Sequence, residues 1–319
     1  MTTARQQLVS TDVTSYYHCV SRCVRRSFLC GKDSFTNRCY EHRREWLESK
    51  ILSLTAVYCI DICAYAIMSN HYHLVVNINQ KKALQLTLHE IVERWGQIHK
   101  LPTLIQRWKN KQLTSQIEQS RSIELIEVWR ERLSSLSWFM KEINYEIACK
   151  ANQEDECTGH FWEGRFKSQA LLDERALAAA MAYVDLNPVR AGIANNPETS
   201  EFTSIKARIE ALNKNLPTAP CLHPFIGNAA NEWQDGIPFR LIDYLELVDW
   251  TSRQFRQDKA SLNDKTPSIL ARLNFKHTSW LKVCTHLEQT RSTAVGSRTQ
   301  AILAKYVLKK RKVNLYLLE

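Results

Sequence analysis

Alternating and helical hydrophobic patterns divide the first two thirds of the chain into strands and helices. Segments 16–24, 57–67, 72–78 and 161–171 are rich in β-branched and aromatic residues and are predicted to be strands. Segments 40–56, 136–150 and 173–186 carry apolar residues at helical spacing, and the last is Ala-rich with acidic residues at its start. The order strand, helix, strand, strand, helix, strand, helix is the split βαβ arrangement plus one helix. The pattern predicts an α+β fold, a ferredoxin-like antiparallel sheet with helices on one face.

Two regions fall outside this pattern. Residues 80–135 are polar with scattered tryptophans, which indicates a helical insertion outside the core. After about residue 200 the pattern changes: 211–220 is typical of a linker, and 238–255 and 278–312 are predicted to be helical. We therefore expect a first domain over residues 1–210, which holds the insertion, and a mainly helical C-terminal extension over residues 211–319.

Composition adds an expectation about partners. Hydrophobic residues at 44% and charged residues at 24% are those of an ordinary globular protein, and the net charge of +10 favours a polyanionic partner. No apolar run is long enough to span a bilayer, and the N-terminal residues lack an apolar signal core. A cytoplasmic location without membrane association is expected.

The ten cysteines form no C-x-x-C pair, so buried free thiols are the expected state. A structural zinc site drawn from Cys19, Cys23, Cys30 and Cys39 is an alternative, although the spacing matches no common zinc pattern.

The pair His71 and His73 is the first candidate for chemistry. Residues two apart on a strand point to the same face, so the two imidazoles would supply two ligands of an open metal site. A chain with ten histidines is expected to hold roughly 0.3 such His-x-His pairs by chance. Two half-buried polar side chains on an edge strand are the alternative.

Tyr183 is the second candidate, in the last turn of the helix predicted over 173–186. A phenol is a poor nucleophile near neutral pH, but it can attack a phosphodiester that a divalent metal polarises and orients. Asn187 lies four residues later and would share the face of Tyr183 if the helix continued, as a third ligand for a hard metal. Alternatively, Asn187 caps a new helix that has Pro188 at its first position, and Tyr183 simply packs on the sheet.

Aromatic residues interleave with Arg165 and Lys167 in the segment from Phe161 to Ser168. On a strand, Arg165 and Lys167 would share one face, where they could contact phosphates or stack on bases. A core strand with a charged solvent side is the alternative. The basic cluster over 305–312 is equally consistent with a nucleic-acid contact and with a solvated helix face.

Four segments in this order resemble the HUH single-strand transposases with one catalytic tyrosine, in particular the REP-associated tyrosine transposases. The segments are Tyr17-His-Cys-Val-Ser-Arg22, Met68-Ser-Asn-His-Tyr-His73, Phe161-Trp-Glu-Gly-Arg-Phe-Lys-Ser168 and Tyr183-Val-Asp-Leu-Asn-Pro-Val-Arg-Ala-Gly192. The resemblance runs from about residue 15 to residue 209. It departs from the family at Tyr72, where a bulky aliphatic residue is usual.

The resemblance implies a metal-dependent transposase and endonuclease that acts on single-stranded DNA near hairpins. His71 and His73 would bind Mg²⁺ or Mn²⁺, with Asn187 as a possible third ligand, and Tyr183 would form a 5′-phosphotyrosine and free a 3′-hydroxyl. The DNA-binding residues expected in the matching segments are Arg22, Arg165, Lys167 and Arg190. The protein would act as a monomer or homodimer.

Two other functions are consistent with the sequence. One is a domesticated DNA-binding protein that keeps the fold and cleaves nothing. The other is a metal-dependent hydrolase of a small substrate, for which the basic surface is incidental.

Overall fold

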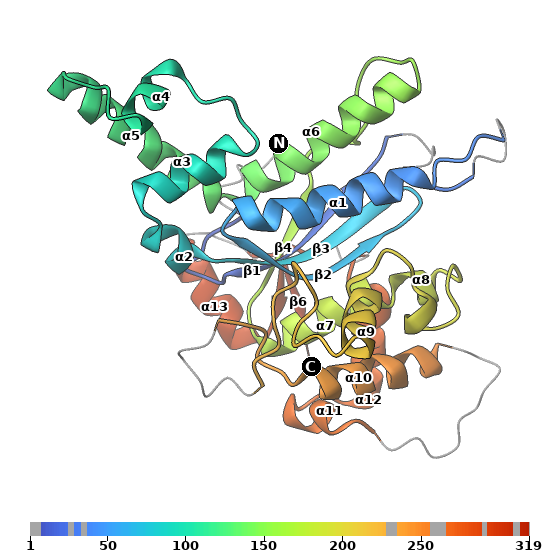
Figure 1. The fold of residues 1–319 in the computed structure, drawn as a ribbon. Coiled ribbons are helices and arrows are strands. Elements are labelled where there is room, and N and C mark those ends of the chain that lie inside the picture. The colour runs from blue at the N-terminus through green and yellow to red at the C-terminus, as the bar shows by residue number, and fades with distance from the viewer. Residues whose placement is uncertain are drawn as a thin grey trace.

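The chain folds around a mixed sheet (Figure 1). The computed structural model describes residues 8–24, 29–32, 37–227, 235–255, 266–288, 292–308 and 313–318. The elements in chain order are β1 (Tyr16–Arg22), α1 (His42–Val57), β2 (Ile60–Ile67), β3 (His71–Ile78), α2 (Gln80–Gln85), α3 (Leu88–Gly96), α4 (Thr103–Lys109), α5 (Gln116–Leu133), α6 (Leu136–Glu154), β4 (Lys167–Leu171), α7 (Glu174–Asp185), α8 (Asn187–Arg190), a 3₁₀ turn (Pro197–Thr199), α9 (Ser204–Asn213), α10 (Leu241–Gln254), α11 (Ser268–Arg272), α12 (His277–His286), β5 (Ala294–Gly296), α13 (Arg298–Val307) and β6 (Leu315–Leu317).

The sheet confirms the predicted fold class. In the described residues its strand order is β2-β3-β1-β4-β5-β6, and the first four strands pair antiparallel, as a ferredoxin-like fold requires. The strands β5 and β6 add to the edge in parallel. The prediction of a continuous helix over 278–312 was therefore wrong around β5, because a three-residue strand is too short to show an alternating pattern.

Two hydrophobic cores lie on opposite faces of the sheet. The helices α1 and α6 cover one face, over alternate residues of β3 such as Leu74 and Val76 (Figure 1). The additional helix α7 covers the other face together with helices of the C-terminal extension, and Val75 points into that second core. Side chains at odd-numbered positions of β3, His71 and His73 included, therefore face α7.

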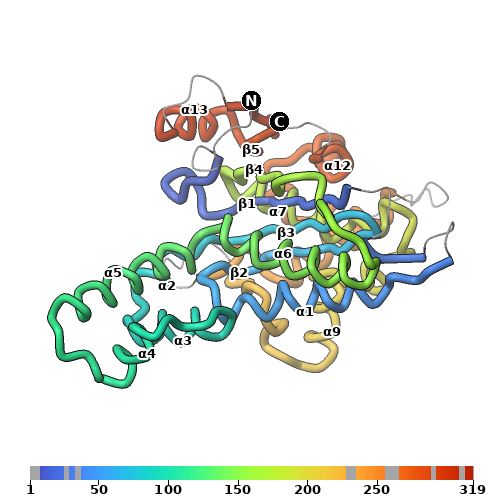
Figure 2. The backbone as a smooth tube through the Cα atoms, turned by 90° about the horizontal axis from the view of Figure 1, so that it is seen from above, coloured from blue at the N-terminus to red at the C-terminus, as the bar shows by residue number. Residues whose placement is uncertain are grey.

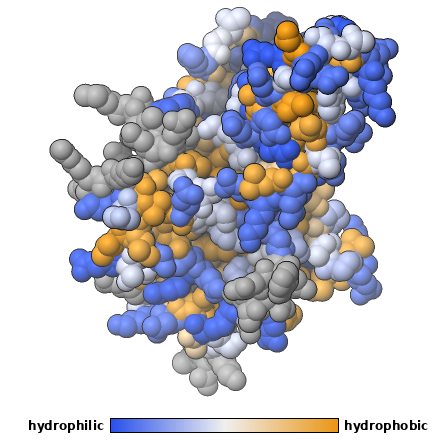
Figure 3. Space-filling model, turned by 90° about the vertical axis from the view of Figure 1, so that its left-hand side faces the viewer, coloured by the Kyte–Doolittle hydropathy of each residue, from blue (hydrophilic) through white to orange (hydrophobic). Residues whose placement is uncertain are grey.

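The insertion between β3 and α6 is helical, as predicted, and its tip projects from the body of the molecule (Figure 2). The prediction that it lies outside the core was wrong. Trp95 of α3 stacks on Trp129 of α5 at 5.4 Å between ring centroids, and both belong to the same hydrophobic core as residues of α1 and α6. The spacing of these tryptophans was obscured by the polar residues around them. Seen from the side of the insertion, the surface mixes hydrophilic side chains with small apolar patches (Figure 3).

The fourth strand is shorter than predicted. Trp162 makes one bridge to Cys23, and the regular ladder with β1 begins only at Lys167. The intervening residues include Gly164, which has no side chain to pack against a neighbouring strand. The strict alternation of faces that was predicted for 161–171 therefore holds only from Lys167 onward.

Candidate active site

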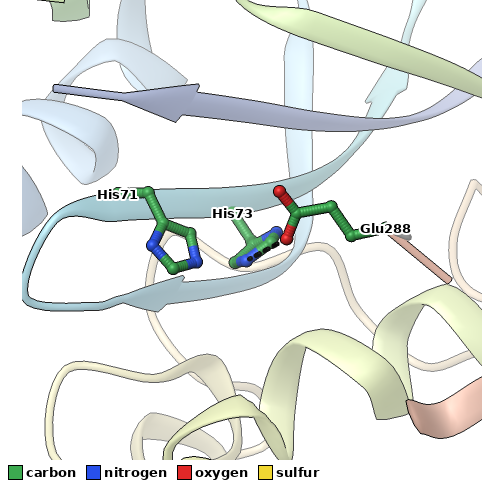
Figure 4. A group of neighbouring side chains, drawn as sticks. All are labelled: His71, His73 and Glu288. Carbon is green, nitrogen blue, oxygen red and sulfur yellow. Dashed lines mark ion pairs between the residues drawn. The ribbon is translucent and has the colours of Figure 1, made fainter. Parts of the chain in front are cut away.

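The site is built on β3, which lies inside the sheet between β2 and β1 rather than at an edge. The hairpin that precedes it closes through a hydrogen bond from the Met68 N–H to the His71 carbonyl, at 2.9 Å. The His71 and His73 rings project from the same face with centroids 4.8 Å apart (Figure 4). Burial and the charge of Arg22 lower the pKa of His71 to about 4, and burial with His71 lowers the pKa of His73 well below its usual range. Both rings are therefore neutral, with lone pairs for a cation.

A chain of buried hydrogen bonds fixes which nitrogen of His73 faces the site. The Gln169 amide Nε2 donates to the carbonyl and hydroxyl of Ser292, at 3.2 and 2.9 Å, so its Oε1 faces His18. His18 Nδ1 donates to that oxygen at 2.8 Å, and its Nε2 lies 3.0 Å from His73 Nδ1. With its proton on Nδ1, His18 must accept at Nε2, so His73 donates from Nδ1. The lone pair of His73 is left on Nε2, the atom that faces the site.

The Nδ1 of His71 also has a hydrogen-bond acceptor, which comes from the preceding residue. Its Nδ1 lies 2.5 Å from the Asn70 side-chain oxygen, which can only accept. The Nε2 of His71 is therefore also free to act as a ligand. Hydrogen bonds of this kind from a non-ligating nitrogen are typical of metal-binding histidines.

Glu288, which follows α12 in the C-terminal extension, supplies a third donor that the sequence did not predict. The ligand atoms of His71, His73 and Glu288 all lie within 4.8 Å of one another, and Glu288 Oε2 is 3.9 Å from His73 Nε2 (Figure 4). Arg22 binds the other carboxylate oxygen at 3.1 Å. Burial alone would raise the pKa of Glu288, but the charge of Arg22 and its hydrogen bond to the carboxylate act against burial, and the pKa lies below its usual value. No sequence spacing connects this residue to the histidines.

Tyr183 reaches the same place from α7. Asp173 caps this helix by accepting from the Ala176 N–H at 2.9 Å, and the helix packs on β2 and β3. The Tyr183 hydroxyl donates to Glu288 Oε2 at 3.5 Å, and its ring meets that of His73 edge-on at 5.7 Å. Burial and the carboxylate of Glu288 raise the pKa of the phenol, against the lowering effect of Arg190. The structure therefore brings together the histidine pair and the tyrosine that the sequence analysis selected.

One of the two interpretations of Asn187, that its side chain caps a new helix, was wrong. The capping position before α8 is Leu186, and no side chain caps that helix. The Leu186 N–H bonds to Ala182 and the Arg190 N–H bonds to Leu186, so helical bonding runs on almost unbroken. The Asn187 side chain is buried and its Nδ2 has no hydrogen-bond partner. Its role as a metal ligand stays a prediction.

The four predicted DNA-binding residues occupy different environments. The Arg190 guanidinium lies 4.0 Å above the Tyr183 ring and donates to the Cys284 carbonyl at 2.6 Å. Arg165 and Lys167 are exposed and line a hollow of about 140 Å³ together with Arg22. Arg190 thus contacts the candidate nucleophile itself, whereas the other three border a basic hollow beside the site. The basic residues 309–312 lie outside the described residues.

Two other sequence-based candidates do not reach this site. Tyr72 points to the opposite face, where its buried hydroxyl donates to the Asn144 side-chain oxygen at 2.7 Å. Burial raises its pKa, so it is no alternative nucleophile here. In the described residues no cysteine forms a disulfide, and no group of potential metal ligands contains the zinc set proposed from Cys19, Cys23, Cys30 and Cys39.

Comparisons with known proteins find one distantly similar structure and no matching family. No family model matches the chain, and no curated protein matches it. The chain is similar to a solved REP-associated tyrosine transposase bound to a REP hairpin, over 70% of this chain and 90% of that one, at 11% sequence identity and a TM-score of 0.36. Similarity at this level does not establish a function for this chain. No helix in the described ranges is long and apolar enough to cross a membrane.

Proposed function

We propose that this protein is a metal-dependent endonuclease and strand transferase for single-stranded DNA, with Tyr183 as the nucleophile. The observation that carries the proposal is the convergence of Tyr183 with His71 and His73. They come from separate elements, α7 and β3, yet the phenol and the two imidazoles share the carboxylate of Glu288 as a neighbour. A structural tyrosine packed on a sheet needs no such surroundings.

The donor set fits a divalent cation. His73 Nε2 is buried and has no hydrogen-bond partner, which is costly for a polar atom unless another group completes it. We propose that His71, His73 and Glu288 hold Mg²⁺ or Mn²⁺, which would polarise the scissile phosphate and orient it for attack. Asn187 is the competing third ligand. Titration of Glu288→Gln and Asn187→Ala with Mn²⁺ would distinguish them, because only loss of the true ligand weakens binding.

The remaining residues prepare the nucleophile. Arg190 over the ring opposes the burial that disfavours the phenolate, and the α7 backbone fixes the position of Tyr183. In the reaction the phenol loses its proton and its oxygen forms a bond to phosphorus. The bond from phosphorus to the 3′-oxygen breaks, and that oxygen takes up a proton. The DNA 5′-phosphate stays on Tyr183 and a 3′-hydroxyl end is released. Attack by that hydroxyl reverses the step and rejoins DNA.

The polyanionic substrate agrees with the charge of the chain and with the basic hollow lined by Arg22, Arg165 and Lys167. The hairpin in the substrate rests on the sequence resemblance to REP-associated tyrosine transposases. A monomer or homodimer and a cytoplasmic location stay predictions.

The test is cleavage of labelled oligonucleotides that contain a hairpin with single-stranded flanks, in the presence of Mg²⁺ or Mn²⁺ and after chelation. We expect metal-dependent cleavage in the flank and none in a fully paired duplex of the same sequence. Binding without cleavage across a library of hairpins would instead favour a DNA-binding protein that has lost catalysis. Cleavage that survives chelation would contradict the metal dependence.

A further inference from the structure

A second cluster of potential ligands lies at the β2 edge of the sheet, away from the histidine pair on β3. Asp61 of β2, His223 and Asp235 offer ligand atoms that all lie within 4.8 Å of one another. His223 Nδ1 is 3.8 Å from Asp61 Oδ2, and His223 Nε2 is 3.7 Å from Asp235 Oδ1. The last two residues belong to the C-terminal extension, so the cluster joins the extension to the sheet.

The backbone places His223 firmly against β2. Leu222 forms a parallel bridge with Ile62, and the His223 N–H donates to the Ile62 carbonyl at 2.8 Å. Arg208 reinforces the same contact by donating to the carbonyls of Cys63 and His223, at 2.7 and 3.3 Å. The segment thus covers the edge strand of the sheet, and the imidazole is held in place before any ligand binds.

His223 is the observation that points to a missing partner. Its side chain is only 3% exposed, yet Nε2 is buried without a hydrogen bond. Burial lowers the pKa of the imidazole against the opposing charges of Asp61 and Asp235, which supports a neutral ring with a lone pair. An ordinary histidine between two carboxylates would be expected to be charged and to donate to both at hydrogen-bonding distance.

The two carboxylates are also oriented for a shared cation. The Asn79 side-chain amide donates to both of them, to Asp61 Oδ2 at 3.2 Å and to Asp235 Oδ2. The amide cannot turn around, because its oxygen caps α2 by accepting from the Lys82 N–H at 3.0 Å. Each carboxylate keeps its Oδ1 for another ligand, and Lys82 Nζ lies 3.8 Å from Asp61 Oδ1. Supporting hydrogen bonds of this kind are typical around metal ligands.

We infer that Asp61, His223 and Asp235 form a second, structural metal site that takes a divalent transition metal of the zinc class. An imidazole and carboxylate oxygens are donors that Zn²⁺ takes in proteins. Ligand atoms about 2.0–2.1 Å from a tetrahedral zinc lie roughly 3.4 Å apart, close to the 3.7 Å between His223 Nε2 and Asp235 Oδ1. The bound metal fastens the extension, which carries Glu288, to the edge of the sheet.

The experiment removes the first site so that only the second can bind. The full-length His71→Ala/His73→Ala variant is stripped with a chelator, then titrated with Zn²⁺ and with Co²⁺, whose visible absorption reports its coordination. We expect one Zn²⁺ per chain and a melting temperature that rises by roughly 5 °C at a zinc concentration a hundredfold above the dissociation constant. Adding Asp235→Asn should weaken binding by roughly tenfold or more.

Asp235 is 58% exposed on its side chain, so this variant is expected to fold, and Asp249→Asn on α10 is the matched control. His223→Gln tests the imidazole directly and should remove the Co²⁺ absorption. The inference is overturned if the double-alanine protein binds no zinc, or if Asp235→Asn and Asp249→Asn bind it equally well. Neither result bears on Tyr183 or on DNA cleavage, which are tested separately.

Discussion

Gln169 is linked to His73 through His18 by two successive hydrogen bonds. Its replacement by leucine tests whether this hydrogen-bond chain orients His73. The leucine keeps the size of the side chain but cannot accept from His18 Nδ1 or donate to Ser292. His18 is then free to carry its proton on Nε2 and to donate to His73 Nδ1. His73 would in turn carry its proton on Nε2, where it blocks the ligand position.

The size of the effect follows from the geometry. Gln169, His18 and His73 are all buried, so the lost acceptor leaves a polar atom unsatisfied at a cost of about 1–3 kcal/mol in the free energy of unfolding. Loss of a partner behind a ligand typically weakens metal binding about 10–100-fold, which is about 1.4–2.7 kcal/mol. We therefore expect Gln169→Leu to lower both the stability and the Mn²⁺ affinity.

The assay is calorimetric titration with Mn²⁺ in an Asp235→Asn background, which weakens the second proposed site, together with urea unfolding of the metal-free protein. Thr251→Val is the matched control, because it removes the acceptor for the buried Trp280 indole N–H, at 2.9 Å, far along the chain from the site. It should cost similar stability and leave Mn²⁺ affinity unchanged. A Gln169→Leu protein that binds Mn²⁺ as tightly as its parent would refute the orienting role of the chain.

Three further outcomes follow from the structure. His71→Ala/His73→Ala should abolish Mn²⁺ binding at this site and metal-dependent cleavage, and titration showing undiminished binding would remove the pair as ligands. Arg165→Ala/Lys167→Ala should weaken binding to all DNA sequences and reduce the slope of log affinity against log salt by about one unit per lost contact; an unchanged slope would make them ordinary surface residues. Asp185→Asn should cost about 1–3 kcal/mol of unfolding free energy, because its buried carboxylate accepts from the Ile205 N–H and from the hydroxyls of Ser204 and Tyr244. Urea unfolding within 0.5 kcal/mol of the parent, on the order of experimental scatter, would contradict that role.

The sequence predicted the ferredoxin-like sheet because its strands and helices are long enough to show their periods. The β3 strand places Leu74 and Val76 in one core and the histidines on its other face, and α7 is apolar from Ala176 to Val184. The short strands β5 and β6 carry too few residues for a pattern, and their pairing with β4 depends on contacts across the chain. The burial of Trp95 and Trp129 was missed because burial is a property of packing, which local polarity does not report.

The residues of the candidate site also fall into two groups, those that local sequence could reveal and those that only the fold brings together. His71, His73 and Tyr183 could be selected because each belongs to a local motif on a regular element. Glu288 could not be selected from the sequence, because it lies over a hundred residues from Tyr183 and still farther along the chain from His73. No sequence spacing links it to either residue. The orienting partners His18 and Gln169 were equally hidden, since only the sheet register brings them beside β3.

The most direct test of the central claim is mass spectrometry of the protein after reaction with a hairpin oligonucleotide and Mn²⁺. The account predicts a covalent adduct whose digestion leaves the nucleotide on the peptide that contains Tyr183. The Tyr183→Phe protein, which keeps the ring and its packing, should fold and bind the same DNA but form no adduct and cut nothing. An adduct on any other residue, or normal cleavage by Tyr183→Phe, would contradict the account.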